Sequence, residues 1–363
     1  MSTSTSPSTA ASRVVVTNAH LVGSINLPDA ATVIGTVADH LAPYVRRIPD
    51  GEVGERYYWL QFQSFRLDHT RGLTRVGDTP VFVRGRFDQR PFALDGTVPA
   101  DELQFPDLGY ATAAIDSYAH FSALRDAGRV PVGVRFQVSL PTPAAVVGVF
   151  IASGDRAAVE PAYERALFGE LDRIVAAVPH DDLAVQWDTA LEFAFLEQVR
   201  LRGNPMQAWW DDVLGGVVER AGRQAGHVPA DVQVGFHLCY GDVEEAHFVQ
   251  PTDTGTIAQV LGGLFATAPR HIDWVHLPVP IERDDAAYFA PLASVTVPVG
   301  TEIDLGLVHH EDGVEGAERR IAAAATVLDR FGVGTECGFG RGPATRTAPL
   351  LDLHRAIVEA HAA

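Results

Sequence analysis

The stretch VQVGFHLC, residues 232–239, carries the signal from which the fold can be worked out. Its β-branched and aromatic residues are typical of a buried β-strand, and it ends in His237 and Cys239. Side chains two positions apart in a strand point to the same face, so we expect both residues to face the same way. The only other cysteine, Cys337, ends a second predicted strand, GVGTEC at 332–337. Both thiols are therefore predicted at the carboxyl ends of strands.

Similar apolar runs recur along the chain, and helical patterns lie between many of them, which predicts a parallel sheet. The predicted strands start near residues 14, 44, 131, 183, 233, 272, 302 and 332. The clearest predicted helices are 29–44, with Asp29 as its N-cap, 162–178, 205–222, 254–267, 316–332 and 344–362. Another helix is expected within 101–128.

Eight β/α units predict an α/β fold, a (β/α)₈ TIM barrel that forms one domain over residues 14–363. We expect a segment at about 55–125 to be inserted after the second strand, with a hairpin at 79–87. A doubly wound sheet is the alternative, but such a sheet usually has a glycine-rich phosphate loop after its first strand. The corresponding stretch NAHLVGSINLP (18–28) lacks the GxGxxG spacing.

The composition excludes several classes of function. The 28 basic and 46 acidic residues give a net charge of −18, which argues against nucleic acid or an anionic membrane as partner. No apolar run is long enough to span a bilayer, and the Ser/Thr-rich residues 1–13 are predicted to be a disordered tail, not a secretory signal. Two cysteines cannot form a disulfide framework. These features fit a soluble cytoplasmic protein and leave homo-oligomerisation open.

On a barrel, the carboxyl ends of the strands gather at the face where active sites form. His237, Cys239 and the distant Cys337 are ligand types that suit Zn²⁺, and three protein ligands with an open position are typical of a catalytic zinc site. The alternative is that both cysteines are simply buried, as cysteines often are.

Other candidates also lie at predicted strand ends. Asp188 in VQWDTALEF (185–193) points toward the same face, although it could instead cap the next helix. GLVHHEDG (306–313) places His309 and His310 just past a strand, where either could be a general acid. The charged, glycine-flanked stretch IPDGEVGERYYW (48–59) contains Glu52, Glu55 and Arg56 and is typical of either a ligand-binding loop or a surface turn.

These segments occur in an order that resembles the catalytic domain of cobalamin-independent methionine synthase. HLVGSINLP (20–28) resembles the family's IGSFPQ-type opening, and DGEVGERYYWLQF resembles its GE-x-ER segment. VQWDTALEF is similar to the IQ-x-DEP strand end, and FHLCYGD to the H-x-CY zinc segment. GLVHHEDGVEG takes the place of GVYDIHSPR, and ECGFGR resembles the final DCGLKTR. The resemblance extends over about residues 14–345 and implies the same (β/α)₈ barrel.

The resemblance also implies chemistry. Zn²⁺ held by His237, Cys239 and Cys337 would keep a substrate thiol as a thiolate, which would attack the alkyl carbon of a methyl or alkyl donor. Glu52 and Asp188 would hold the ammonium group of an amino-acid thiol, and Ser24 its carboxylate. Arg56 belongs to the same binding segment, and His309 or His310 would lie near the acid that protonates the leaving group.

The sequence departs from the family at the expected fourth zinc ligand, a Glu at the end of the next strand. That strand reads DWVHLPVP (273–280), with Pro278 near the expected position and His276 as a substitute ligand. The DEP triplet is DTA, the HSP triplet is lost, and the chain has about half the length of full methionine synthases. The thiol and the donor, folate included, therefore stay undetermined.

Two alternatives to a thiol alkyltransferase stay open. One is a metal-free decarboxylase or lyase on the related uroporphyrinogen-decarboxylase barrel, with Arg46, Arg47 and Arg135 as candidate carboxylate ligands. The other is a non-catalytic barrel that binds a small molecule.

Overall fold

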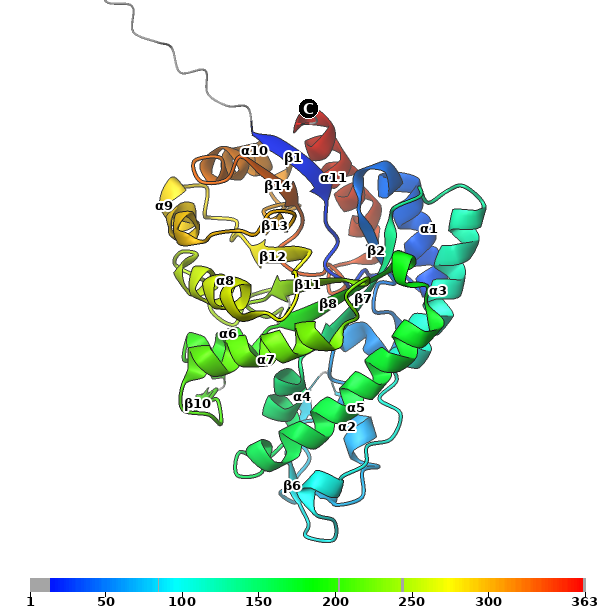
Figure 1. The fold of residues 1–363 in the computed structure, drawn as a ribbon, viewed down its shortest axis with the longest axis vertical. Coiled ribbons are helices and arrows are strands. Elements are labelled where there is room, and N and C mark those ends of the chain that lie inside the picture. The colour runs from blue at the N-terminus through cyan, green and yellow to red at the C-terminus, as the bar shows by residue number, and fades with distance from the viewer. Residues whose placement is uncertain (1–13, 84, 202, 243–244, 362–363) are drawn as a thin grey trace, which may run out of the picture.

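An eight-stranded parallel sheet forms the centre of the computed structural model, which describes residues 14–83, 85–201, 203–242 and 245–361 (Figure 1). In spatial order the strands are β1 (Val15–Ala19), β14 (Arg330–Val333), β13 (Glu302–Gly306), β12 (Trp274–Pro278), β11 (Gln233–Leu238), β8 (Leu183–Thr189), β7 (Arg135–Pro141) and β2 (Arg47–Pro49). Parallel bridges from Ala19 to Val45 and from Ser24 to Gly51 join the first strand to the last. All eight predicted strands are present, and the TIM-barrel prediction is confirmed.

Helices cover the outside of the sheet (Figure 1). The long ones are α1 (Ala30–Leu41), α3 (Tyr110–Asp126), α5 (Arg156–Ala177), α7 (Val213–His227), α8 (Gly255–Thr267), α10 (Gly313–Ala324) and α11 (Thr347–His361). Short helices α4 (Pro143–Phe150), α6 (Leu191–Leu196) and α9 (Ala286–Phe289) follow strand ends. The Asp29 side chain accepts a hydrogen bond from the Thr32 amide at 2.7 Å, so its predicted N-cap role is confirmed.

Two predicted boundaries are wrong. The helix predicted at 316–332 ends at Ala324, because the chain turns there and enters β14 at Arg330, two residues before the predicted strand. Cys337 consequently lies in the loop after β14 and not within the strand. The helix predicted at 205–222 begins only at Val213, where Asp212 caps it by accepting from the Gly215 amide at 3.0 Å.

The chain between β2 and α3 forms short elements that extend away from the barrel at the bottom of Figure 1. They are α2 (Gln63–Leu67) and two antiparallel pairs, β3 (Leu73–Arg75) with β6 (Phe92–Leu94), and β4 (Phe82–Val83) with β5 (Phe87–Asp88). The last pair is the hairpin expected at 79–87. Helix α3 packs on α1, α5 and β7 as a barrel helix does. A further antiparallel pair, β9 (Arg200–Leu201) with β10 (Asn204–Pro205), precedes α7. The tail expected at residues 1–13 lies outside the described residues.

Polar side chains fill one layer inside the barrel. Asp188, His237, His276 and Asp304 pair in register across the four neighbouring strands β8, β11, β12 and β13, and each is at most 6% exposed. A parallel strand end aims such residues at the carboxyl face of the barrel, which is where the candidate site lies.

In the described part of the chain, no helix is long and apolar enough to cross a membrane.

Candidate metal centre and the two cavities beside it

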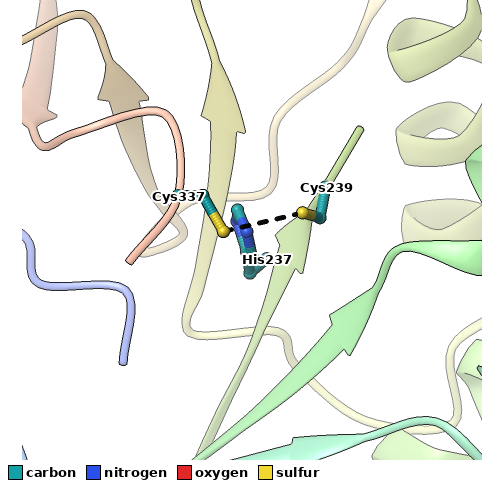
Figure 2. Close-up of side chains that lie close together, drawn as sticks. All are labelled: His237, Cys239 and Cys337. Atoms are coloured by element: carbon teal, nitrogen blue, oxygen red, sulfur yellow. Dashed lines mark hydrogen bonds between the residues drawn. The ribbon is translucent and has the colours of Figure 1, made fainter. Parts of the chain in front are cut away.

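Three soft ligand groups converge at the carboxyl end of the barrel (Figure 2). His237 is the second-last residue of β11, Cys239 follows that strand, and Cys337 comes from the loop after β14. Their ligand atoms lie within 4.8 Å of one another, and the two sulfur atoms are 3.8 Å apart, so both thiols are free. Among the described residues this is the one cluster of His, Cys, Asp or Glu with such spacing. The three predicted ligands are therefore brought together.

The surroundings of the cysteines favour a thiolate. Cys337 hydrogen-bonds to Cys239 and, with the nearby His237, holds the pKa of Cys239 well below its usual range, while the pKa of Cys337 is raised. The Gly241 amide also donates to the Cys239 sulfur at 3.2 Å. Burial acts to lower the pKa of His237, but Cys239 and the carboxylates of Asp188 and Glu52 raise it overall. A negative sulfur with backbone support is the form that binds a metal.

The imidazole of His237 leaves one nitrogen for a ligand. Its Nδ1 lies 2.8 Å from Nδ1 of His276, whereas its buried Nε2 has no hydrogen-bond partner among the described residues. A buried nitrogen without a hydrogen-bond partner is costly, and beside two thiols it is a suitable ligand for zinc. The residues present therefore fit Zn²⁺.

A small cavity of about 50 Å³ lies on one side of the three ligands. It is lined by Ser24, Glu52, Asp188 and Arg341 together with the ligands themselves. The structure thus brings Ser24, Glu52 and Asp188 together with the three predicted ligands, whereas Arg56 and His276 do not line this cavity. Arg341 is an addition that the motif comparison did not single out.

The loop after β2 presents Glu52 to this cavity through a buried ion pair. Arg56 contacts Asp50 with both terminal nitrogens, at 2.6 and 3.2 Å, and Asp50 also accepts from the Glu52 amide at 3.0 Å. Glu52 has a φ of 50°, a left-handed conformation that costs a non-glycine residue about 1 kcal/mol or more. Arg56 does not line the cavity, so it supports the loop and not a ligand. Glu55 pairs with Arg66 at 2.6 Å away from the site.

The two carboxyl groups of the small cavity are short of positive charge. Burial raises the pKa of Glu52 to about 7, although Arg341 and Arg56 act against it. Burial likewise raises the pKa of Asp188 well above its ordinary value, and the nearby Glu52 adds to the effect. Two buried carboxyls with raised pKa values in one cavity are a feature of functional sites, because a bound cation would remove the penalty.

Arg341 lies opposite these carboxyls. Its Nη1 donates to the Ser24 hydroxyl at 2.9 Å, and its Nε is 3.7 Å from the Asp242 carboxylate. Close packing of the loop after β14 sets this arrangement, because a Cβ on Gly338 would lie only 2.3 Å from the Ser24 hydroxyl oxygen. The cavity therefore offers two carboxyls together with a guanidinium and a hydroxyl.

A wider cavity of about 300 Å³ lies on the other side of Cys337. His309, His310 and Glu336 line it, and Cys337 and Asp242 belong to both cavities. Burial lowers the pKa of His309 to about 4, and its Nε2 donates to the Val279 carbonyl at 2.9 Å. His309 is thus neutral at pH 7 and has little capacity to release a proton, while the half-exposed His310 pairs with Glu311 at 3.0 Å. The acid role of these histidines stays a prediction.

Glu336 is the second lining residue that the sequence interpretation missed. Its carboxyl lies 3.6 Å from Nε2 of His247 and 3.8 Å from Nδ1 of His309. Burial, with the neighbouring Glu282 as the next cause, raises its pKa to about 9. Glu336 immediately precedes Cys337 in the sequence. This position could have indicated that Glu336 lies close to the metal ligands.

The arginines proposed for a decarboxylase have other roles. Arg46 and Arg47 contact Glu302 at 3.1 and 2.8 Å, at the amino ends of β2 and β13 and thus at the opposite end of the barrel. Arg135 donates to the His180 carbonyl at 2.6 Å. None of the three lines either cavity. Arg46 lines a different cavity, of about 530 Å³, beside Glu302. The three arginines therefore do not belong to the site at the carboxyl ends of the strands.

Comparison with solved structures identifies the class of fold. A B12-independent methionine synthase from Shewanella sp. W3-18-1, solved with selenomethionine, matches with a TM-score of 0.61 over 95% of this chain and 97% of that one, at 13% identity. A putative vitamin-B12-independent methionine synthase from Listeria monocytogenes matches with a TM-score of 0.59 over 96% and 98% of the two chains, at 15% identity. No family model and no curated protein matches the sequence.

The chain thus has the fold of the B12-independent methionine synthase structures, as the resemblance implied. It spans nearly the whole of both matched structures, so its single-barrel length is shared with them. At these identities the likeness concerns the fold alone, and function has to be argued from the site.

Proposed function

We propose that this protein is a zinc-dependent methyl- or alkyltransferase that acts on a small-molecule thiol. The observation that carries the proposal is the convergence of His237, Cys239 and Cys337, with a free buried nitrogen and two free sulfurs, between two cavities. A transferase with two substrates needs a place for each, and both cavities reach Cys337. When bound, zinc supplies deprotonation of a coordinated thiol at neutral pH.

The small cavity suits the thiol acceptor. Glu52 and Asp188 would hold an ammonium group, and Ser24 with Arg341 would hold a carboxylate, so an α-amino-acid thiol satisfies both ends. The raised pKa values of the two carboxyls support this assignment, because the cation they lack is the one such a ligand brings. Charge-assisted hydrogen bonds at both ends would orient the sulfur toward the ligand cluster.

The wider cavity would admit the methyl or alkyl donor. The sulfur of the acceptor forms a bond to the donor's alkyl carbon, and the bond from that carbon to its leaving atom breaks with its electron pair. His309, His310 or Glu336 line the space where the leaving atom would lie. The thiol proton passes to water when the acceptor binds. A leaving group that departs as an anion takes up one proton in the wider cavity, from Glu336 or from water.

The test is metal content together with thiol alkylation. We expect one zinc per chain by elemental analysis, less than a tenth of that in Cys239→Ala, and a zinc content unchanged in His309→Ala, which alters the wider cavity without removing a ligand. Mass spectrometry of homocysteine incubated with the zinc-loaded protein and a panel of methyl donors should detect the S-methyl product. Equal zinc in wild type and Cys239→Ala would refute the ligand assignment, and full activity in metal-free protein would refute the mechanism.

A further inference from the structure

His276 lies on the strand from which a fourth ligand is expected, two residues before the expected position, and its hydrogen bond to the metal cluster is with His237. It lies on β12 directly beside His237 in the register of β11, and it is completely buried. The two rings are 4.9 Å apart, and their Nδ1 atoms are separated by 2.8 Å. His276 is not one of the three residues whose ligand atoms cluster within 4.8 Å.

The contact between the two Nδ1 atoms requires one proton, because two bare lone pairs at this distance repel and two N–H groups clash. A histidine that binds a metal through Nε2 keeps its own proton on Nδ1 and donates it. His237 would therefore donate to His276, and His276 would hold its proton on Nε2, which, like Nε2 of His237, is buried and has no hydrogen-bond partner among the described residues. In this assignment, Nε2 of His237 carries a lone pair and no proton, and this nitrogen is available as a ligand.

We propose that His276 is a positioning residue that fixes the tautomer and orientation of His237, so that the chain supplies three zinc ligands and leaves the fourth position to the substrate thiol. The inference rests on the zinc site of the proposed function. With only three protein ligands, the zinc site would have an open fourth position. An acceptor thiol would then displace no protein side chain when it binds.

The packing around His276 explains why the ring holds its place. Its ring stacks on His20 at 5.1 Å with an interplanar angle of 27°, and His20 Nε2 is in turn 3.2 Å from the Gln186 side-chain oxygen. On the other side the chain passes so close that a Cβ on Gly334 would lie 3.3 Å from His276 Nε2. The stacked His20 ring and the close approach of Gly334, just after β14, therefore leave the His276 ring little room to rotate.

A matched pair of variants separates positioning from bulk. His276→Asn keeps an acceptor oxygen near the position of Nδ1, whereas His276→Leu has a similar volume and no acceptor. We expect zinc affinity, measured by competition with a chromophoric chelator, to fall roughly 10- to 100-fold in His276→Leu and by much less in His276→Asn. His40→Leu removes a histidine of the outer helix α1, which pairs with Asp352, and should leave the affinity unchanged. Equal affinities for all three variants would overturn the inference.

X-ray absorption of zinc in the wild-type protein tests the ligand count without any variant. We expect two sulfur neighbours and a single imidazole in the resting protein, and three sulfurs with a single imidazole after addition of homocysteine. Two imidazoles at rest would make His276 a ligand and overturn the inference. One imidazole at rest with no added sulfur and no alkylated thiol would refute the proposed function while the role of His276 stands, so the two failures are distinguishable.

Discussion

The two cavities that meet at Cys337 differ in size and in charge. The smaller, about 50 Å³, is lined by the carboxyls of Glu52 and Asp188 and by Arg341 with Ser24. The wider, about 300 Å³, has an excess of acids: its charged residues are Asp242, Glu245, Glu282, Glu311 and Glu336 against Arg346, which pairs with Glu245. One cavity is therefore built to recognise a small ligand with both charges, and the other to admit a larger one.

The difference also extends to how the walls are held. Glu52 stands on a strained backbone that the Asp50–Arg56 pair supports, and Asp188 is fixed by the Gln186 amide at 2.9 Å. In the wider cavity, several carboxylates lie at the rim and are exposed to water. Preorganisation of this kind lowers the cost of binding, so the smaller cavity should be the more selective. Substitutions in one cavity should therefore have effects that substitutions in the other do not.

The largest effect is expected at the two carboxyls of the small cavity. Glu52→Gln and Asp188→Asn each remove a charged partner of the ammonium group, and such a loss in a buried pair costs about 2–3 kcal/mol. We therefore expect KM for homocysteine to rise roughly 30- to 150-fold in either variant, with zinc content unchanged.

The control for this prediction is a substrate and not a second variant. The acid 4-mercaptobutanoate is homocysteine without its amino group, so it cannot use the two carboxyls. Its KM should change less than threefold in both variants. A parallel rise for both thiols would mean that Glu52 and Asp188 act on the metal or on the fold instead of on the ammonium group.

Arg341 should show the opposite selectivity with a smaller effect. Arg341→Gln removes the guanidinium but leaves the Ser24 hydroxyl free to donate to a carboxylate, so we expect KM for homocysteine to rise about tenfold. The amine 3-aminopropane-1-thiol, which is homocysteine without its carboxylate, should be unaffected or used slightly better. An equal loss with both thiols, measured at saturating zinc, would place Arg341 in loop structure and not in recognition.

The sequence predicts the barrel well because alternating strands and helices leave few other arrangements. It also predicts that His237 and Asp188 face the same end of the barrel, because strand ends of a parallel barrel share one face. Whether Cys337 comes near His237 depends on the geometry of the barrel and on the loop after β14, which the sequence pattern leaves open. It does not predict Arg341, since the path of the loop after β14 depends on how closely Gly338 passes Ser24. That approach is a tertiary contact between residues more than 300 positions apart, and no local pattern encodes it.

The end of α10 and the role of His276 are both hard to predict, and for similar reasons. Apolar spacing continues through Val327 and Leu328, which pack against the core from a turn and not from a helix, so periodicity alone extends the helix too far. For His276, strand position correctly places the residue next to the ligands. Whether its ring reaches the metal or a neighbouring ring depends on side-chain packing, which a strand pattern does not contain.

The smallest effect concerns the zinc-free protein without substrate, and it has opposite signs for Glu52 of the small cavity and His309 of the wider one. The pKa of Glu52 is raised to about 7, so the folded state holds a proton that the unfolded state releases, and stability falls as pH rises from about 4.5 to 7. The pKa of His309 is lowered to about 4, so the unfolded state takes up a proton first, and stability falls as pH drops from about 6.5 to 4. Glu52→Gln should therefore melt at a higher temperature than wild type at pH 8, and His309→Gln at pH 4.5.

Each of these gains should amount to about 1–3 kcal/mol, because a shift of one pKa unit corresponds to about 1.4 kcal/mol and both groups are largely buried. Melting temperatures of wild type and both variants across this pH range measure the effect by circular dichroism. The difference between each variant and wild type should vanish at the other end of the range, where the group has the same charge folded and unfolded. Gains of the same sign at every pH would show that the substitutions act through packing. They would then not report the raised pKa of Glu52 or the lowered pKa of His309.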